Sequence, residues 1–307
     1  MQKATKRTAA NLGGATVLLL LMITCFIHID RLSEGVYHGL CLCAEAIIPT
    51  LFPFLIFSEL LLSHSLIERI LSSLSRPFAR LLRIPVEGGI AFLMGNLFGF
   101  PMGAKAVAHY YRTGSISKNT AEKLLLFSGN ASPFFLIGSV GLGMLGSTRT
   151  GVFLYLNQIL ISFFCGLLLS LFSPHSPTSL KITQGLKKEK GSLPSIVRSA
   201  VKQTLFICGY ILFFSAVIAV ILPYIKNSFA ANFIASVLEI GSASAFSATY
   251  GGKYAIPFCA FAASFAGISV FFQTLDCIED TDLNIRAYLP TKLLCGIAAF
   301  LSALILT

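Results

Sequence analysis

Apolar residues occur along this chain in long uninterrupted runs rather than in alternation with polar ones. A helix that crosses a bilayer needs about 20 consecutive apolar residues. Runs of this kind lie at 12–29, 40–63, 124–147, 151–173, 203–225 and 288–306. They predict an all-α fold, a polytopic transmembrane helical bundle in which residues 1–307 form a single membrane domain.

Composition supports this interpretation. Of the 307 residues, 55% are hydrophobic and 12% are charged, and the mean hydropathy is +0.80. A soluble domain carries about 25% charged residues, so the pattern excludes a soluble enzyme. The net charge of +10 comes from basic residues in a few loops. No nucleic-acid-binding motif accompanies it, so no nucleic acid is expected as a partner.

Basic loops orient the predicted spans, because cytoplasmic loops are enriched in Lys and Arg. Lys3, Lys6 and Arg7 place the N-terminus in the cytoplasm, ahead of an uncleaved first span that exits near Asp30. Basic segments at 69–83, 112–123 and 174–198 are expected on the same side. The acidic residues are expected outside, namely Asp276, Glu279, Asp280 and Asp282. The last span then returns, which predicts a multi-pass protein of the cell membrane with a cytoplasmic C-terminus.

Two more apolar segments, 88–111 and 229–275, are interrupted by Gly, Pro and polar residues. The charge pattern places both ends of the first inside and both ends of the second outside, so each is expected to be a re-entrant or broken hairpin. The opposite orientations predict two inverted repeats, 40–173 with its flanking helices and 199–307, joined by a cytoplasmic loop at 174–198. Sequence echoes agree, since TLF at 50–52 recurs at 204–206, and 99–105 aligns without a gap with 267–273.

The first interruption supplies four candidate substrate-binding residues, Asn96, Pro101, Gly103 and Lys105. Pro101 removes a backbone donor and Gly103 permits close approach of another backbone. Lys105 stands in an apolar stretch, where an ammonium group needs a partner, a cavity or a ligand. The alternative is a lysine that extends to the cytoplasmic interface.

A polar stretch inside 124–147 adds Asn130, Ser132 and Pro133. Ser is favoured as a helix N-cap and Pro at the first helical position. This predicts a half-helix that begins at Pro133, with a positive dipole end in the membrane that can hold an anion. The alternative is a kink satisfied by neighbouring helices.

In the second half the counterparts are Glu239, Ser242, Ser269 and Gln273. Glu239 is a carboxylate in an apolar context, and three roles stay open for it: pairing with Lys105, binding a proton or a coupling cation, or facing the exterior. Glu45 and Glu59 lie near span ends and are expected to extend to the interface.

Several of these motifs carry a resemblance to a known family. They are PTLFPF at 49–54, SELL at 58–61, GFPMGAK at 99–105, SGNASP at 128–133 and FAGISV at 265–270, followed by Gln273 and the segment 288–294. From about 40 to 305 the chain resembles the sporulation integral membrane protein YlbJ family, in the nucleoside-recognition or Gate group. That group includes spore maturation proteins and the membrane parts of nucleoside and ferrous-iron carriers.

The resemblance implies transmembrane transport. In a sporulating source it implies the movement of dipicolinic acid, a small aromatic dicarboxylate, across the membrane around the forespore. Lys105, the helix start at Ser132 and Pro133, and Gln273 suit such a substrate chemically.

Three functions follow as expectations. The first is a transporter of a small organic anion, dipicolinate-like if the source sporulates. The second is a nucleoside or other small-solute transporter of the Gate group. The third is a non-transporting membrane assembly factor in spore maturation, which would tolerate replacement of Lys105 and Asn130.

An enzyme is not expected, because the sequence contains no nucleophile–base set and no metal-binding spacing. No cofactor or metal is expected either, and the eight cysteines, most of them inside apolar runs, are expected to be small buried side chains. The expected partners are an anionic small molecule and the lipid bilayer. A homo-oligomer or a membrane partner protein stays open.

Overall fold

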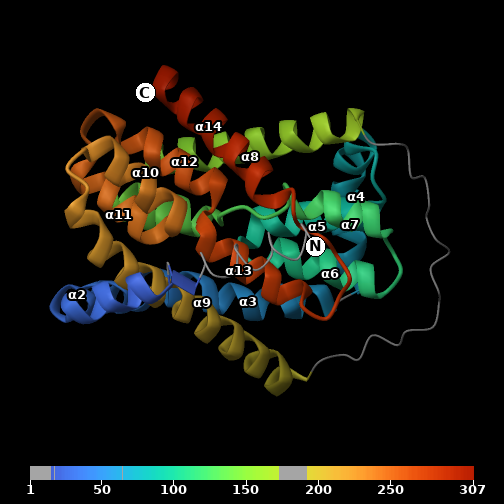
Figure 1. Cartoon of the computed structure of the whole chain (residues 1–307). Coiled ribbons are helices and arrows are strands. Elements are labelled where there is room, and N and C mark those ends of the chain that lie inside the picture. Colours follow the sequence, from blue (N-terminus) through green and yellow to red (C-terminus); the bar gives the residue numbers. More distant parts are fainter. Residues whose placement is uncertain (1–14, 17, 64, 173–191) are drawn as a thin grey trace, which may run out of the picture.

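The computed structural model describes residues 15, 16, 18–63, 65–172 and 192–307, which form helices and turns with no strand among them (Figure 1). Within these residues, five helical stretches are long and apolar enough to cross a membrane. They are Ile29–Leu60, Thr148–Leu171, Leu193–Tyr224, Gly252–Ile278 and Tyr288–Leu306. The predicted all-α polytopic bundle is confirmed.

The first long helix begins earlier than the hydropathy pattern predicts. α2 (Ile29–Leu42), a π-helical turn η1 (Cys43–Ile47) and α3 (Ile48–Ser63) follow one another directly. The predicted connection between 29 and 40 is therefore wrong. α2 packs closely on α9 (Leu193–Ile221), since a Cβ on Gly35 would lie 2.6 Å from the Ala219 Cβ. Of the predicted first span, Leu18–Ile27 is a shorter apolar helix, and residues 12–14 and 17 lie outside the described part.

The rest of the first half consists of the helix α4, a hairpin, a broken helix and a long helix. Its elements are α4 (Ser65–Leu82), α5 (Val86–Phe98), α6 (Met102–Arg112), α7 (Lys118–Leu125), the π-helical η2 (Phe134–Met144) and α8 (Thr148–Leu171). The chain bends by 105° between α4 and α5. α5 and α6 pack on each other around the turn at 99–101, which confirms the predicted interruption of 88–111. Between α7 and η2 the chain is non-helical over most of 126–132.

Apart from α4, which has no counterpart, the second half repeats this order. After α9 and the short η3 (Leu222–Tyr224) come α10 (Ser228–Leu238), α11 (Ile240–Tyr250), η4 (Gly252–Tyr254), α12 (Ala255–Phe265), α13 (Gly267–Ile278) and α14 (Tyr288–Leu306). α10 and α11 form a hairpin around Glu239, whereas α12 and α13 continue as one candidate span broken at Ala266. The prediction that 229–275 is one broken region with both ends on one side is therefore wrong.

Each half thus contains a long helix, a helical hairpin, a broken helix and a second long helix. Figure 1 shows the hairpins α5–α6 and α10–α11 toward opposite ends of the molecule. The echo between 50–52 and 204–206 falls on the first long helix of each half. The other echo does not fit this order, because 99–105 begins in a hairpin turn and 267–273 follows the break of a spanning helix. Residues 193–198, assigned to the loop from the sequence, are helical in α9, and 173–191 lie outside the described part.

The basic connection after α6 and the acidic connection after α13 lie at the same end of the bundle. Arg112 forms an ion pair with Asp280, and Lys118 Nζ lies 2.8 Å from Asp282 Oδ2. The amide of Asn284 also donates to Glu122 at 2.8 Å. Placing these two connections on opposite sides of the membrane, as the charge pattern suggested, is wrong. Acidic residues contribute little to membrane orientation, so the acidic stretch was a poor indicator.

Candidate functional site

The turn of the first hairpin fits against the non-helical segment 126–132. A Cβ on Gly95 or Gly103 would lie 1.7 Å or 2.3 Å from the carbonyl oxygen of Ser128. Glycine at both positions lets α5 and α6 close around this carbonyl. Gly99, with φ of 80°, and Pro101, after a cis peptide bond, form the turn itself. Pro101 therefore belongs to the hairpin turn and Gly103 to the first turn of α6, and neither lines the pocket described below.

Side chains from neighbouring helices form hydrogen bonds with the backbone groups of 126–132. A non-helical segment at membrane depth requires such partners. Gln158 of α8 accepts from the Ala131 amide at 3.0 Å and donates to its carbonyl at 2.7 Å. Asn130 donates to Asn96 Oδ1 at 3.0 Å and to Ser162 Oγ at 2.9 Å. The predicted residues Asn96 and Asn130 are thus buried together and hold the break in place, while Gln158 and Ser162 were missed from the sequence.

The predicted half-helix start is confirmed. The helix begins at Pro133, and Ser132 Oγ accepts a hydrogen bond from the Phe135 amide at 3.2 Å. A hydroxyl that accepts from an amide of the first turn is the N-cap arrangement. The positive end of this half-helix is therefore held at Ser132.

Glu239 forms the turn of the second hairpin. Its side chain is 1% exposed, and its two carboxylate oxygens accept from the amides of Gly241 at 2.8 Å and Ser242 at 2.6 Å. The turn touches the break between α12 and α13, because a Cβ on Gly267 would lie 3.0 Å from the Leu238 carbonyl oxygen. Glu239 therefore caps α11, a role that the sequence did not suggest.

A small pocket of about 60 Å³ lies where these turns and breaks meet. Its lining comes from η1 and α3 (Ile47, Thr50, Leu51), α9 (Ile207, Ile211), the first half (Phe100, Ala131, Ser132, Phe135) and the second half (Glu239, Ile240, Val270, Gln273). Since a buried water needs roughly 15 Å³, the pocket has room for a few waters or for part of a small solute. Most of its wall is apolar, as in small-molecule sites generally.

The structure brings three of the predicted site residues to this pocket, namely Ser132, Glu239 and Gln273. Ser242 and Ser269 lie close by without lining it. Ser242 shares a hydrogen bond of 2.7 Å with Ser215 of α9, and Gln273 Nε2 donates to Ser269 Oγ at 3.4 Å. Phe100, Phe135 and Thr50 are lining residues that the sequence reasoning did not select.

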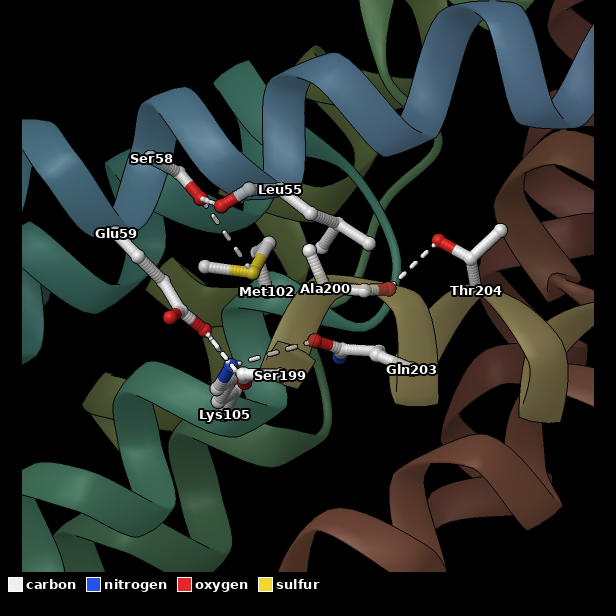
Figure 2. Close-up of polar contacts among 9 residues, drawn as sticks. All are labelled: Leu55, Ser58, Glu59, Met102, Lys105, Ser199, Ala200, Gln203 and Thr204. Atoms are coloured by element: carbon white, nitrogen blue, oxygen red, sulfur yellow. Dashed lines mark hydrogen bonds and ion pairs between the residues drawn. The ribbon is translucent and has the colours of Figure 1, made fainter. Parts of the chain in front are cut away.

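Lys105 does not line the pocket and forms an ion pair with Glu59 of α3 (Figure 2). Its ammonium group also contacts Gln203 Oε1 at 3.3 Å and Ser199 Oγ at 3.4 Å, both on α9. The Lys105–Glu239 pair considered from the sequence is therefore wrong, and so is the expectation that Glu59 extends to the interface. Lys105 instead joins α6 to the two long helices α3 and α9.

Among the described residues, no cluster of His, Cys, Asp and Glu could hold a metal ion. The polar groups that face the pocket are hydroxyl, amide and carboxylate groups and a helix N-terminus. Such groups can bind and orient a polar solute through hydrogen bonds.

Comparison with known proteins gives one significant match. The chain is 26% identical over 333 aligned positions to the sporulation integral membrane protein YlbJ of Bacillus subtilis (strain 168), covering 95% of this chain and 81% of that protein. No family model matches the chain, and no solved structure matches it significantly. Because the alignment covers 95% of the chain, it extends over both halves of the fold.

Proposed function

Since this match supports the assignment of the chain to the YlbJ family, we propose that this multi-pass membrane protein is a transporter of a small organic anion. One observation carries the proposal: the pocket is lined by both hairpin turns, by the first helix break and by α13, which follows the second break, so that each half of the chain contributes to it. Secondary transporters commonly bind their substrates near the membrane midplane, between two repeats with discontinuous helices. The matching element order of the two halves supports the proposed inverted repeats.

A dipicolinate-like dicarboxylate is the proposed substrate class if the source sporulates. The half-helix that begins at Pro133 directs a positive dipole end toward the pocket, which favours a carboxylate. Gln273 and Thr50 supply neutral polar groups, and Phe100 and Phe135 supply aromatic surface. An aromatic ring with carboxylate substituents matches this mixture of contacts.

A second candidate substrate is a neutral polar solute such as a nucleoside. The observation in its favour is that the ionisable side chain lining the pocket is a carboxylate, that of Glu239. An anion would have to approach this group, whereas a neutral solute would experience no repulsion from it. Both candidate substrates would bind in the same pocket.

We also propose an orientation. If the basic connection between α6 and α7 is cytoplasmic, the acidic connection between α13 and α14 is cytoplasmic as well, because the two are ion-paired. α14 would then cross outward, and the C-terminus would lie outside.

Uptake into liposomes that contain the purified protein tests the function. We expect saturable uptake of radiolabelled dipicolinate, measured beside uridine, and a loss of about tenfold in Thr50→Val, which changes the pocket wall. Thr249→Val is the matched control, because each threonine hydroxyl bonds the carbonyl four residues earlier and only Thr50 lines the pocket. Uptake of uridine alone would replace the dicarboxylate by a nucleoside as the proposed substrate. A folded protein that moves neither solute would favour the assembly-factor alternative.

A further inference from the structure

Lys292 is a buried lysine of the last helix, α14. Its side chain is 2% exposed, and its ammonium group donates to the carbonyl oxygen of Gly129 in the broken helix α7–η2. The same group lies 5.9 Å from the centroid of the Phe100 ring. The ion pairs within the described part of the chain do not include Lys292.

This arrangement gives the ammonium group one strong acceptor. A lysine carries three N–H donors, and the described surroundings of Lys292 are one carbonyl acceptor, one aromatic face and the nearby thiols of Cys165 and Cys295. Lys105 is different, because a carboxylate and two polar side chains surround it. A buried charge in a membrane protein normally has a partner or faces a cavity or a ligand.

Lys292 stands directly behind the wall of the pocket. Phe100 is both a lining residue of the pocket and the ring that Lys292 approaches. Gly129 also adjoins this ring, since a Cβ on Gly129 would lie 3.5 Å from a ring carbon of Phe100. Ala131 and Ser132, which follow Gly129, line the pocket. Lys292 and the pocket therefore share the Phe100 ring.

The other charge at the pocket does not compete for Lys292. Both carboxylate oxygens of Glu239 are occupied by amides at the start of α11. A carboxylate of a solute is the acceptor that the ammonium group lacks, and a charge-assisted hydrogen bond of this kind is among the strong ones in proteins.

We propose that Lys292 is the anion-binding residue of the transport site and that the Phe100 ring covers it when no solute is bound. The substrate class is then an aromatic carboxylate, whose ring contacts Phe100 while its carboxylate accepts from Lys292. The inference rests on the proposed function, since it requires that the pocket holds the transported solute. The structural alternative is that Lys292 only anchors the broken helix through Gly129.

Equilibrium binding to the purified full-length protein in detergent tests this inference without measuring transport. The probes are pyridine-2,6-dicarboxylate and its neutral diamide, measured by titration calorimetry. We expect Lys292→Met to lose dicarboxylate affinity by about tenfold or more, while its weak affinity for the diamide is unchanged. Lys292→Arg, which keeps the charge, should stay within a few-fold of the wild type. Lys202→Met, at an exposed position of α9, is the matched control.

An equal loss for both probes in Lys292→Met would overturn the inference in favour of anchoring, and so would unchanged dicarboxylate binding in a folded variant. If Lys292→Met does not fold, Phe100→Ala decides, because uncovering the ammonium group should strengthen dicarboxylate binding over diamide binding. No change in that ratio would contradict the proposal. A wild type that transports uridine but does not bind the dicarboxylate would overturn this inference and leave the transport function in place.

Discussion

The Lys105 ammonium group on α6 donates to the Glu59 carboxylate on α3, and the same carboxylate oxygen accepts from Ser199 Oγ of α9 at 3.1 Å (Figure 2). Both charged side chains are partly exposed, 34% for Lys105 and 20% for Glu59. The contact fastens the first hairpin to the first long helix of each half. A substitution here should therefore affect the packing of the hairpin rather than the chemistry of the pocket.

This gives a prediction for a double-mutant cycle. Glu59→Gln and Lys105→Met should each lower thermal stability in detergent, and the two changes together should cost less than their sum. A partly exposed pair of this kind is expected to show a coupling energy of about 0.5–1 kcal/mol. Glu45→Gln, an exposed glutamate on η1, is the control and should have little effect. Strictly additive effects would contradict the pairing.

Close packing around the Ser128 carbonyl gives a second prediction. Gly103→Ala places a methyl group 2.3 Å from that oxygen in the present geometry, so the hairpin must shift. We expect a loss of about 1–3 kcal/mol in the free energy of unfolding, as for overpacked cores. Gly209→Ala, on α9 with nothing within 4 Å of the new methyl group, should be neutral or stabilising. Equal effects at the two positions would show that the hairpin and the break are not in contact.

The sequence predicted much of this fold because its strongest signals are local. Length and hydropathy located α8, most of α9 and α14, and Ser132 with Pro133 marked the start of a half-helix, since capping depends on adjacent residues. The partners across the bundle could not be predicted in the same way. Glu59 is 46 residues from Lys105, and Gly129 is 163 residues from Lys292.

Charge patterns misled the sequence analysis where tertiary contacts decide. Asp280 and Asp282 belong to an acidic stretch that suggests an exterior loop, yet they pair with Arg112 and Lys118 of the basic connection. Lys292 carried no local signal, because a single lysine near the start of an apolar helix is common at membrane interfaces. Its burial becomes visible only when α14 packs against the first broken helix.

The ion-paired connections α6–α7 and α13–α14 are predicted to lie on the same side of the membrane. Cysteine introduced at Lys118 or at Asp282 should react with a membrane-impermeant maleimide from the same side of the membrane. Cysteine at Thr307, at the far end of α14, should react from the opposite side. Labelling of positions 118 and 282 from opposite sides would contradict the ion-paired arrangement and restore the orientation suggested by charge alone.

The same pairs predict a pH dependence. Arg112 lowers the pKa of the Asp280 carboxyl, and Lys118, followed by Tyr111, lowers that of Asp282. A carboxylate whose pKa is lowered by folding stabilises the folded contact above its unfolded pKa of about 4. That contribution disappears as the pH falls through the lowered folded value.

Hydrogen exchange, corrected for the intrinsic effect of pH, measures this loss. Protection of 279–287 should fall below a pH of about 4, and protection of the connection at 225–227, which contains no acidic residue, should not. Parallel changes in both connections would mean that acid unfolds the whole protein rather than releasing these pairs.

The central claim is that a solute crosses the membrane through the pocket between the turns and breaks. The most direct measurement is the reactivity of Gln273→Cys, in a background without the eight native cysteines, toward a charged impermeant thiol reagent added to either side of oriented vesicles. We predict that the reagent modifies the cysteine from both sides, because the pocket must open to each side in turn. Dicarboxylate should slow this modification whichever side the reagent is added to. Modification from one side only, unaffected by the solute, would contradict the account.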